Sequence, residues 1–268
     1  MKLTTLRVEK RNHVGLIWFN RPEIHNALND VVLAELQATL KAMEKDKDVR
    51  AVVLAGHGKS FCAGGDLNWM KKAANFTKAQ NAKDAAGLAD TLWVLASLSK
   101  PTVARVHGNA YAGGMGLVAA CDIAVASTDA VFCLSEVKLG LIPATISPYV
   151  VRAMGERMAG RYFLTAERFD AAEAYRIGFV QELCLPGDLD GRVNDLLGHL
   201  VVAGSRALAE SKKLITLCGG TRITPAIRAE TARRIAAVRA SAEGREGVAS
   251  FLEKRKPKWV SELKLDGA

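Results

Sequence analysis

The sequence has no apolar run near the roughly 18 residues that a membrane-spanning helix needs. Its first residues, Met1–Leu6, have neither the apolar core of a signal peptide nor the Arg- and Ser-rich helix of a transit peptide. Hydrophobic residues make up 49% and charged residues 24%, a balance typical of a globular protein rather than a disordered one. We therefore expect a cytoplasmic globular protein without a membrane partner.

Cysteine and histidine are both scarce and scattered. There are five of each, no C-x-x-C pair occurs, and no two histidines are spaced i,i+4 on a predicted helix. An odd number of isolated cysteines favours reduced thiols in a reducing compartment over a disulfide framework or a zinc site. We therefore expect no metal ion and no disulfide.

Acidic residues are outnumbered by basic ones, 28 to 37, which gives a formal charge of +9. Such an excess either attracts an anionic partner, nucleic acid or a polyphosphate-bearing small molecule, or lies on solvated helix faces. The Lys and Arg residues of the C-terminal third follow predicted helices without the interleaved aromatics of a single-strand binder. Nucleic acid is therefore not the expected partner.

The first half of the chain alternates strand and helix patterns. A strand at 102–106 and the short helix 114–120 are followed by a strand at 122–126, and from about Ser147 the pattern is mainly helical. This alternation is typical of an α/β fold with a sheet covered by helices. The clearest linker, Leu185–Asp188, divides the chain into an α/β core, 1–186, and a helical C-terminal region, 187–268. The other predicted strands cover 3–9, 14–19, 49–55 and 180–185, and the other helices cover 30–44, 78–97, 148–154, 156–164, 171–177, 189–202, 206–216, 225–241 and 243–254.

A glycine-rich segment runs from Gly108 to Gly116. It is not a P-loop, because Gly113 is followed by Gly114 rather than by Lys. It also does not fit a dinucleotide fingerprint, because the preceding strand is predicted to end near Val106, about eight residues too early for the tight turn of that motif. What remains is a helix N-terminus with free amides, which can hold a developing oxyanion as well as a phosphate.

A second glycine-rich segment, Ser60–Leu67, also follows a predicted buried strand. Cys62 within it lacks the neighbouring base that a nucleophilic thiol needs. Two such loops after two strands of one sheet indicate a shared site to which each contributes one amide.

Glu136 is a lone carboxylate in the largely apolar stretch Phe132–Pro143. It is either a surface residue that pairs with Lys138 or caps a helix, or a buried residue beside a ligand. In the second case its pKa would rise and it could exchange protons near neutral pH.

Five segments in this order resemble the enoyl-CoA hydratase/isomerase (crotonase) family. The match continues through 164–180 to the terminal Phe251–Trp259, so it covers almost the whole chain. The segments are Asn20–Leu28 (NRPEIHNAL), Phe61–Leu67 (FCAGGDL), His107–Leu117 (HGNAYAGGMGL), Cys121–Ile123 (CDI) and Ser135–Pro143 (SEVKLGLIP).

The resemblance implies a spiral of ββα turns, a helical C-terminal trimerisation region, and a homotrimer or a hexamer made of two trimers. It implies that the amides of Gly65 and Gly113 form an oxyanion hole for the thioester oxygen of an acyl-CoA, with Glu136 as the catalytic carboxylate. No separate cofactor is implied, because coenzyme A is part of the substrate. The residues implied in substrate or coenzyme A binding are Glu23, Ile24, His25, Ala63, Gly65, Asp66, Leu67, Gly113, Gly116 and Lys254, the last with basic neighbours and from an adjacent subunit.

Two departures narrow this resemblance. Two-glutamate hydratases of the family carry a Glu where this sequence has Gly116, and bulkier residues at 144–148 replace a glycine-rich run. Together these departures resemble bacterial methylglutaconyl-CoA hydratases, which act in leucine breakdown. The resemblance therefore implies hydration of a 2-enoyl-CoA in leucine or fatty acid breakdown. Alternatives are an enoyl-CoA isomerase or a decarboxylase that uses Glu136, or a non-enzymatic RNA-binding protein of this fold.

Overall fold

The computed structural model describes residues 3–261 and 263, and the chain folds through repeated β-β-α units. After β2, the first strand of each unit joins a large sheet and the second joins a small one. The predicted C-terminal region, 187–268, extends beyond the described residues. The units consist of β1 (Leu6–Arg11), β2 (Val14–Phe19) and α1 (Asp30–Lys45); β3 (Ala51–Gly56), β4 (Ser60–Cys62), α2 (Leu67–Ala73) and α3 (Lys78–Ser97); β5 (Thr102–Val106), β6 (Asn109–Tyr111) and α4 (Gly113–Ala120); and β7 (Ile123–Ser127), β8 (Val131–Cys133) and α5 (Ser147–Thr165).

The large sheet has the order β1-β2-β3-β5-β7-β10, and the small sheet has the order β4-β6-β8-β9. Every pairing is parallel except β1–β2 and β8–β9, which are antiparallel. Parallel strands are buried on both faces, and β3 is buried at every position. The remaining elements of the core are β9 (Phe169–Asp170), α6 (Ala171–Arg176), β10 (Glu182–Cys184), α7 (Leu189–Val202) and the short 3₁₀ turns η1 (Pro22–Ile24), η2 (Glu136–Leu139) and η3 (Pro186–Asp188).

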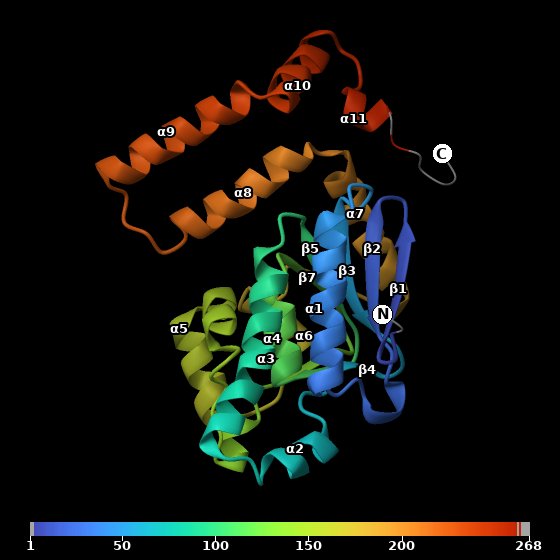
Figure 1. Cartoon of the computed structure of the whole chain (residues 1–268), viewed down its shortest axis with the longest axis vertical. Coiled ribbons are helices and arrows are strands. Elements are labelled where there is room, and N and C mark those ends of the chain that lie inside the picture. The colour runs from blue at the N-terminus through green and yellow to red at the C-terminus, as the bar shows by residue number, and fades with distance from the viewer. Residues whose placement is uncertain (1–2, 262, 264–268) are drawn as a thin grey trace.

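Helices α1, α3 and α4 pack against the large core cluster, which includes Leu36, Leu92 and Met115, and Figure 1 shows them side by side on one face of the large sheet. A second cluster joins Val193 and Leu197 of α7 to β3, β5 and β7. The two clusters cover the faces of the sheets. A ligand can therefore reach the sheets only at the ends of the strands.

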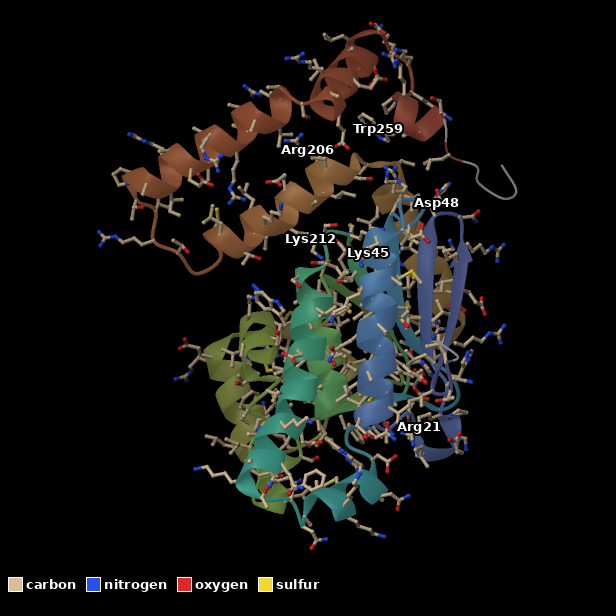
Figure 2. All side chains as sticks on the ribbon, in the orientation of Figure 1. Arg21, Lys45, Asp48, Arg206, Lys212 and Trp259 are labelled. Atoms are coloured by element: carbon tan, nitrogen blue, oxygen red, sulfur yellow. The ribbon has the colours of Figure 1, made fainter. Side chains whose placement is uncertain are left out.

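The last helices extend away from the sheets. They are α8 (Ser205–Cys218), α9 (Pro225–Arg239), α10 (Ala242–Leu252) and α11 (Lys258–Ser261). Figure 1 shows α8 and α9 across the top of the core, at the end opposite α2. Lys212 on α8, which Figure 2 shows below that helix, forms an ion pair with Asp122 of the core at 2.7 Å. Arg50 donates to the Ala203 carbonyl at 2.6 Å, just before α8. Within the described ranges, no helix is both long and apolar enough to cross a membrane.

Several predicted elements are confirmed, and others were missed. The strand Thr102–Val106 and the helices Lys78–Ser97 and Leu189–Val202 have the predicted bounds. The predicted interruption between 154 and 156 is also present, because Gly155 leaves the helical conformation within α5 with φ of 78°. The sequence reasoning missed the small sheet: β4, β6 and β8 are only three residues long, and long-range pairing defines them.

Candidate functional site at the edge of the small sheet

Three predicted site residues follow three neighbouring parallel strands. Cys62 of β4 pairs with Ala110 of β6, and Tyr111 of β6 pairs with Cys133 of β8. Shortly after these strands end come Gly65, Gly113 and Glu136 respectively. The carboxyl ends of parallel strands meet at one edge of a sheet, where α/β proteins commonly bind ligands. The topology therefore brings the three residues together, with Gly113 in the middle.

The first two loops are also in direct contact. A Cβ at Gly64 would lie 3.2 Å from both the Ala112 Cβ and the Tyr111 carbonyl oxygen, and one at Gly114 would overlap the Cys62 carbonyl. Side chains at these positions would push the loops apart. The glycines therefore allow the close approach of the two loops.

The amides of Gly65 and Gly113 are free. Gly113 is the first residue of α4, so its N–H has no partner within the helix. Neither amide has an acceptor in the part of the chain that the structure describes, and both residues are half-buried. Ala112, the helix N-cap, has φ of 46°, a strained conformation for a residue with a Cβ. Two unpaired amides at adjacent loops can stabilise one negative oxygen.

Glu136 opens the 3₁₀ turn η2 and is half-buried. Its Oε2 is inaccessible to solvent and lacks a hydrogen-bond partner among the described residues. Burial raises the pKa of Glu136 above its ordinary 4.5, and a backbone hydrogen bond opposes this rise. The sequence-based alternative, an ion pair with Lys138, is wrong, because no such pair forms within the described chain. An unpaired buried carboxylate with a raised pKa is suited to accept and return a proton.

The predicted coenzyme A segments adjoin the Gly65 loop. Glu23, Ile24 and His25 are exposed, and the His25 carbonyl accepts from the Ala63 amide at 3.0 Å. The His25 imidazole lies 3.1 Å from the Ser60 hydroxyl. Leu67, at the start of α2, is 72% exposed, so its side chain is open to a ligand. The structure thus gathers these predicted contacts along one rim.

Asp66 and Gly116 are engaged within the chain. The Asp66 carboxylate accepts from Arg21, from Asn68 and from Trp69, so both of its oxygens have partners within the chain. Gly116 is buried one turn into α4, where a Cβ would overlap Ile146 Cγ2 and lie 2.8 Å from Ile146 Cβ. The space beside Gly116 is therefore filled by Ile146, which the sequence reasoning had included only as part of a bulky segment.

Lys254 lies far from this edge of the small sheet within the same chain. It lies between α10 and α11, and Figure 1 shows these helices at the opposite end of the molecule from α2. Its predicted contact with coenzyme A, made from an adjacent subunit, stays a prediction.

The exclusion of a dinucleotide fingerprint took the strand that ends at Val106 as the last one before the helix and missed the short strand β6. Strand β6 ends at Tyr111, only two residues before α4 begins, so the strand–turn–helix geometry is present. Gly114 and Gly116, however, lie inside α4 rather than in the turn. The motif places its first glycine in the turn, so the fingerprint still does not fit.

Cys62 is fully buried, and burial raises the pKa of its thiol to about 12. A thiol with this pKa stays protonated near neutral pH, which agrees with the argument against a nucleophile.

Within the described residues, no group of three or more His, Cys, Asp or Glu side chains is placed to hold a metal ion.

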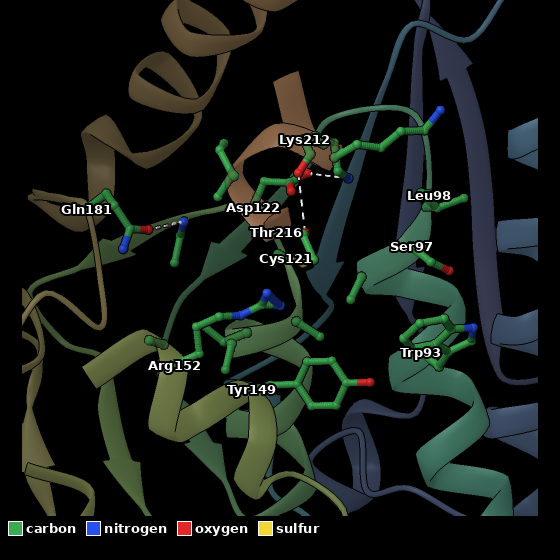
Figure 3. A pocket seen from close by; sticks show the side chains of 18 of the residues that line it. Trp93, Ser97, Leu98, Cys121, Asp122, Tyr149, Arg152, Gln181, Lys212 and Thr216 are labelled. Atoms are coloured by element: carbon green, nitrogen blue, oxygen red, sulfur yellow. Dashed lines mark hydrogen bonds and ion pairs between the residues drawn. The ribbon is translucent and has the colours of Figure 1, made fainter. Parts of the chain in front are cut away.

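A cavity of about 590 Å³ lies at the other end of α4 (Figure 3). Its lining includes Trp93, Tyr149 and Arg152 as well as the Lys212–Asp122 ion pair. None of the predicted site residues lines it. This cavity is therefore separate from the edge that carries Glu136.

Known proteins share this chain's sequence pattern and fold. The family model described as "Enoyl-CoA hydratase/isomerase" matches residues 9–262. The chain belongs to this family. One relative in this family, a crotonyl-CoA hydratase of Syntrophomonas wolfei, is 31% identical to this chain. The match covers 97% of this chain and 100% of the relative.

Solved structures agree with that assignment. An enoyl-CoA hydratase from Shewanella pealeana is 40% identical, with a TM-score of 0.94 and coverage of 96% of this chain and 97% of that one. AtuE of Pseudomonas aeruginosa is 36% identical, with a TM-score of 0.91 and coverage of 96% and 99%. This member of the enoyl-CoA hydratase/isomerase family therefore has the crotonase fold.

Proposed function

We propose that this enzyme is an enoyl-CoA hydratase that adds water across the C2–C3 double bond of a 2-enoyl-CoA. The observation that carries the proposal is the unpartnered Glu136 Oε2, buried at the same sheet edge as the free amides of Gly65 and Gly113. Amides can stabilise the negative oxygen of an enolate, and a carboxylate with a raised pKa can move the protons.

In the proposed reaction, the two amides donate to the thioester oxygen and make C3 electrophilic. Glu136 takes a proton from water as the water oxygen bonds to C3, and the electron pair of the double bond moves into the enolate. Protonated Glu136 then returns a proton to C2, which restores the carboxylate. Each cycle consumes one water and leaves the enzyme unchanged.

The proposed substrate is a short branched acyl-CoA, with methylglutaconyl-CoA of leucine breakdown as the leading candidate. Such an acyl group ends in a carboxylate, which requires a cation or hydrogen-bond donors. The Arg168 guanidinium lies over the ring of Tyr111 at the end of β6, 5.6 Å from the ring centroid, and Lys138 lies in η2 after β8. Two cations beside the ends of these strands support an acyl group of this kind. The cytoplasmic location expected from the sequence stays a prediction.

An enoyl-CoA isomerase is the second candidate, and the packing at Gly116 favours it. Because Ile146 fills the space beside Gly116, this position cannot supply a second carboxylate without repacking. One carboxylate is sufficient to move a proton between C2 and C4 of the same enolate. Hydration with Glu136 alone requires that this group both accept and return the proton.

Absorbance of the conjugated thioester separates the two reactions. We predict that a trans-2-enoyl-CoA loses this band on addition of enzyme, because hydration removes the double bond, and that the methylglutaconyl compound reacts faster than an enoyl-CoA without a terminal carboxylate. A gain of the band from a 3-enoyl-CoA, without loss from any 2-enoyl-CoA, would assign the isomerase instead. If enoyl-CoAs without a terminal carboxylate react fastest, the proposal that the substrate carries such a carboxylate is wrong.

We also propose that the chain forms a homotrimer, or a hexamer of two trimers, through its C-terminal helices. Among the described residues, α8 and α9 contain no fully buried side chain. Ile215, Ile223, Phe251 and Leu252 are between 70% and 87% exposed. Exposed apolar side chains, here around the turn between α8 and α9 and at the end of α10, are typical of an interaction surface.

Light scattering should therefore give three or six times the mass of the chain. We predict that Phe251→Glu lowers this mass, because a charge would be buried at the interface, whereas Lys256→Glu on the exposed neighbouring turn leaves it unchanged. A monomeric mass for the unaltered protein at assay concentration would contradict the assembly.

A further inference from the structure

Arg21 and Asp66 form a half-buried ion pair beside the Gly65 loop. The Nη2 of Arg21 lies 2.8 Å from Asp66 Oδ2, and the two side chains are only 18% and 8% exposed. The Nη1 of Arg21 donates to the Ala27 carbonyl at 2.7 Å. One planar guanidinium thus connects the segment before α1 to the loop after β4.

The backbone around Gly65 is held from both sides by Leu28. The Leu28 amide donates to the Gly64 carbonyl at 2.7 Å, and the Asp66 amide donates to the Leu28 carbonyl at 2.9 Å. Gly65 therefore lies between two residues whose peptide groups are hydrogen-bonded to Leu28. The orientation of the Gly65 N–H depends on how firmly Leu28 and Asp66 are held relative to each other.

Arg21 fixes both of these partners. It holds Ala27, the residue before Leu28, and it holds the Asp66 side chain, whose Oδ1 accepts from the Asn68 amide at 2.8 Å. Burial alone would raise the pKa of Asp66, but the hydrogen bonds from Arg21 and the two backbone amides outweigh burial and lower it. The carboxylate is therefore ionised at neutral pH and the pair persists.

We propose that Arg21 is a positioning residue that acts through Asp66 and Leu28 to aim the Gly65 amide at the thioester oxygen. This inference rests on the proposed function, because it assumes that Gly65 stabilises an enolate. Arg21 touches neither the reacting atoms nor Glu136 in this scheme. Figure 2 shows Arg21 at the lower end of α1, far from the helices of the C-terminal region.

The chemistry of the pair predicts which substitutions matter. Lysine has a single ammonium and cannot bond to Asp66 and Ala27 in the same fork geometry. Arg21→Lys should lower kcat by about 10- to 100-fold with KM changed by less than about threefold, because the misplaced amide matters most in the transition state. Asp66→Asn should act in the same direction, since its amide oxygen can still accept from Asn68 while the ion pair is lost.

A matched control is the exposed pair Arg192–Glu182, in which the side chains are 50% and 32% exposed. Arg192→Lys should leave kcat and KM unchanged, because exposed ion pairs contribute little and these two residues belong to α7 and β10 rather than to the small sheet. Circular dichroism of every variant checks the fold, and if Arg21→Lys does not fold, Asp66→Asn decides the question.

Two further readouts distinguish positioning from general support of the structure. Guanidinium ion added to Arg21→Ala should restore part of kcat by filling the vacated site. Acetoacetyl-CoA, whose enolate carries a negative oxygen, should bind the folded Arg21 and Asp66 variants at least about tenfold more weakly, while free coenzyme A binds them as it binds the unaltered protein.

A kcat close to that of the unaltered enzyme in the folded variants, or a rise in KM alone, would overturn the role of Arg21. A chain that hydrates no enoyl-CoA in its unaltered form would instead overturn the proposed function. The binding of acetoacetyl-CoA is measured without turnover, so the two failures remain distinguishable.

Discussion

Replacing Glu136 with Gln is expected to lower kcat for hydration by about 10²- to 10⁴-fold while KM changes little. The amide has nearly the shape of the carboxylate but cannot accept a proton from water at neutral pH. Glu156→Gln is the matched control, because Glu156 lies exposed on α5. Steady-state kinetics with a trans-2-enoyl-CoA measures the effect, and near-normal turnover in a folded Glu136→Gln protein would remove Glu136 from the mechanism.

The same residue determines the pH dependence. Burial raises the pKa of Glu136 above 4.5, so the unaltered enzyme should lose kcat/KM on acidification with an apparent pKa above that value. The raised pKa also means that ionisation of Glu136 opposes folding. The stabilisation that protonated Glu136 gives the fold is complete below its ordinary pKa, and it is lost as the pH rises through the pKa of the folded state.

Glu136→Gln does not titrate, so its stability relative to the unaltered protein should increase across that pH window. Urea unfolding at about pH 4.5 and about pH 7.5 measures the difference. A variant that is less active and more stable at neutral pH would identify Glu136 as a residue kept for function at a cost in stability. Equal stability differences at both pH values would contradict the raised pKa.

The second large effect is expected from Gly113→Pro, which replaces the amide hydrogen with the Cδ of the proline ring. Proline is well tolerated at the first position of a helix, because that N–H has no partner within the helix. Ala112, the residue before it, has φ of 46° and ψ of −117°, outside the α region that a following proline disfavours and also outside the extended region that it favours, so circular dichroism must show that the variant is folded. We expect a folded protein in which one oxyanion donor is missing and kcat is about 10²- to 10³-fold lower.

Gly113→Ala is the control for the added bulk. It keeps the N–H, and its Cβ would lie 3.0 Å from Leu28 Cδ1, a contact that a small movement of that side chain relieves. The alanine variant should therefore retain most of the activity. The two variants are compared by kcat and by thermal unfolding, and a folded proline variant with the activity of the alanine variant would show that the Gly113 amide is not a donor.

The long elements could be predicted because their signals are local. The apolar residues of α1 recur at helical spacing, Asn29 caps it by accepting from Val32, and β3 is a continuous apolar run. The short strands β4, β6 and β8 carry no such signal. Gly108 and Gly114 flank β6 closely, and only pairing with strands distant in sequence makes these three residues a strand.

The site was predictable in its residue types but not in its environment. The two glycine loops and Glu136 were identified from sequence, and their common edge follows from the strand order. The burial of Glu136 was left open, because a charged residue two positions from Lys138 reads equally well as an exposed pair. Arg21 had no assigned role, since its partner Asp66 lies 45 positions away and no local pattern connects the two.

The contact between Gly116 and Ile146 makes these two positions interdependent in any change of sequence. A carboxylate introduced at 116 alone would collide with Ile146, and a smaller residue at 146 alone would leave a cavity beside α4. Each single step is costly, whereas the pair together can be neutral, so their effects are non-additive. A change from one carboxylate to two in this chain therefore requires that both positions be exchanged together.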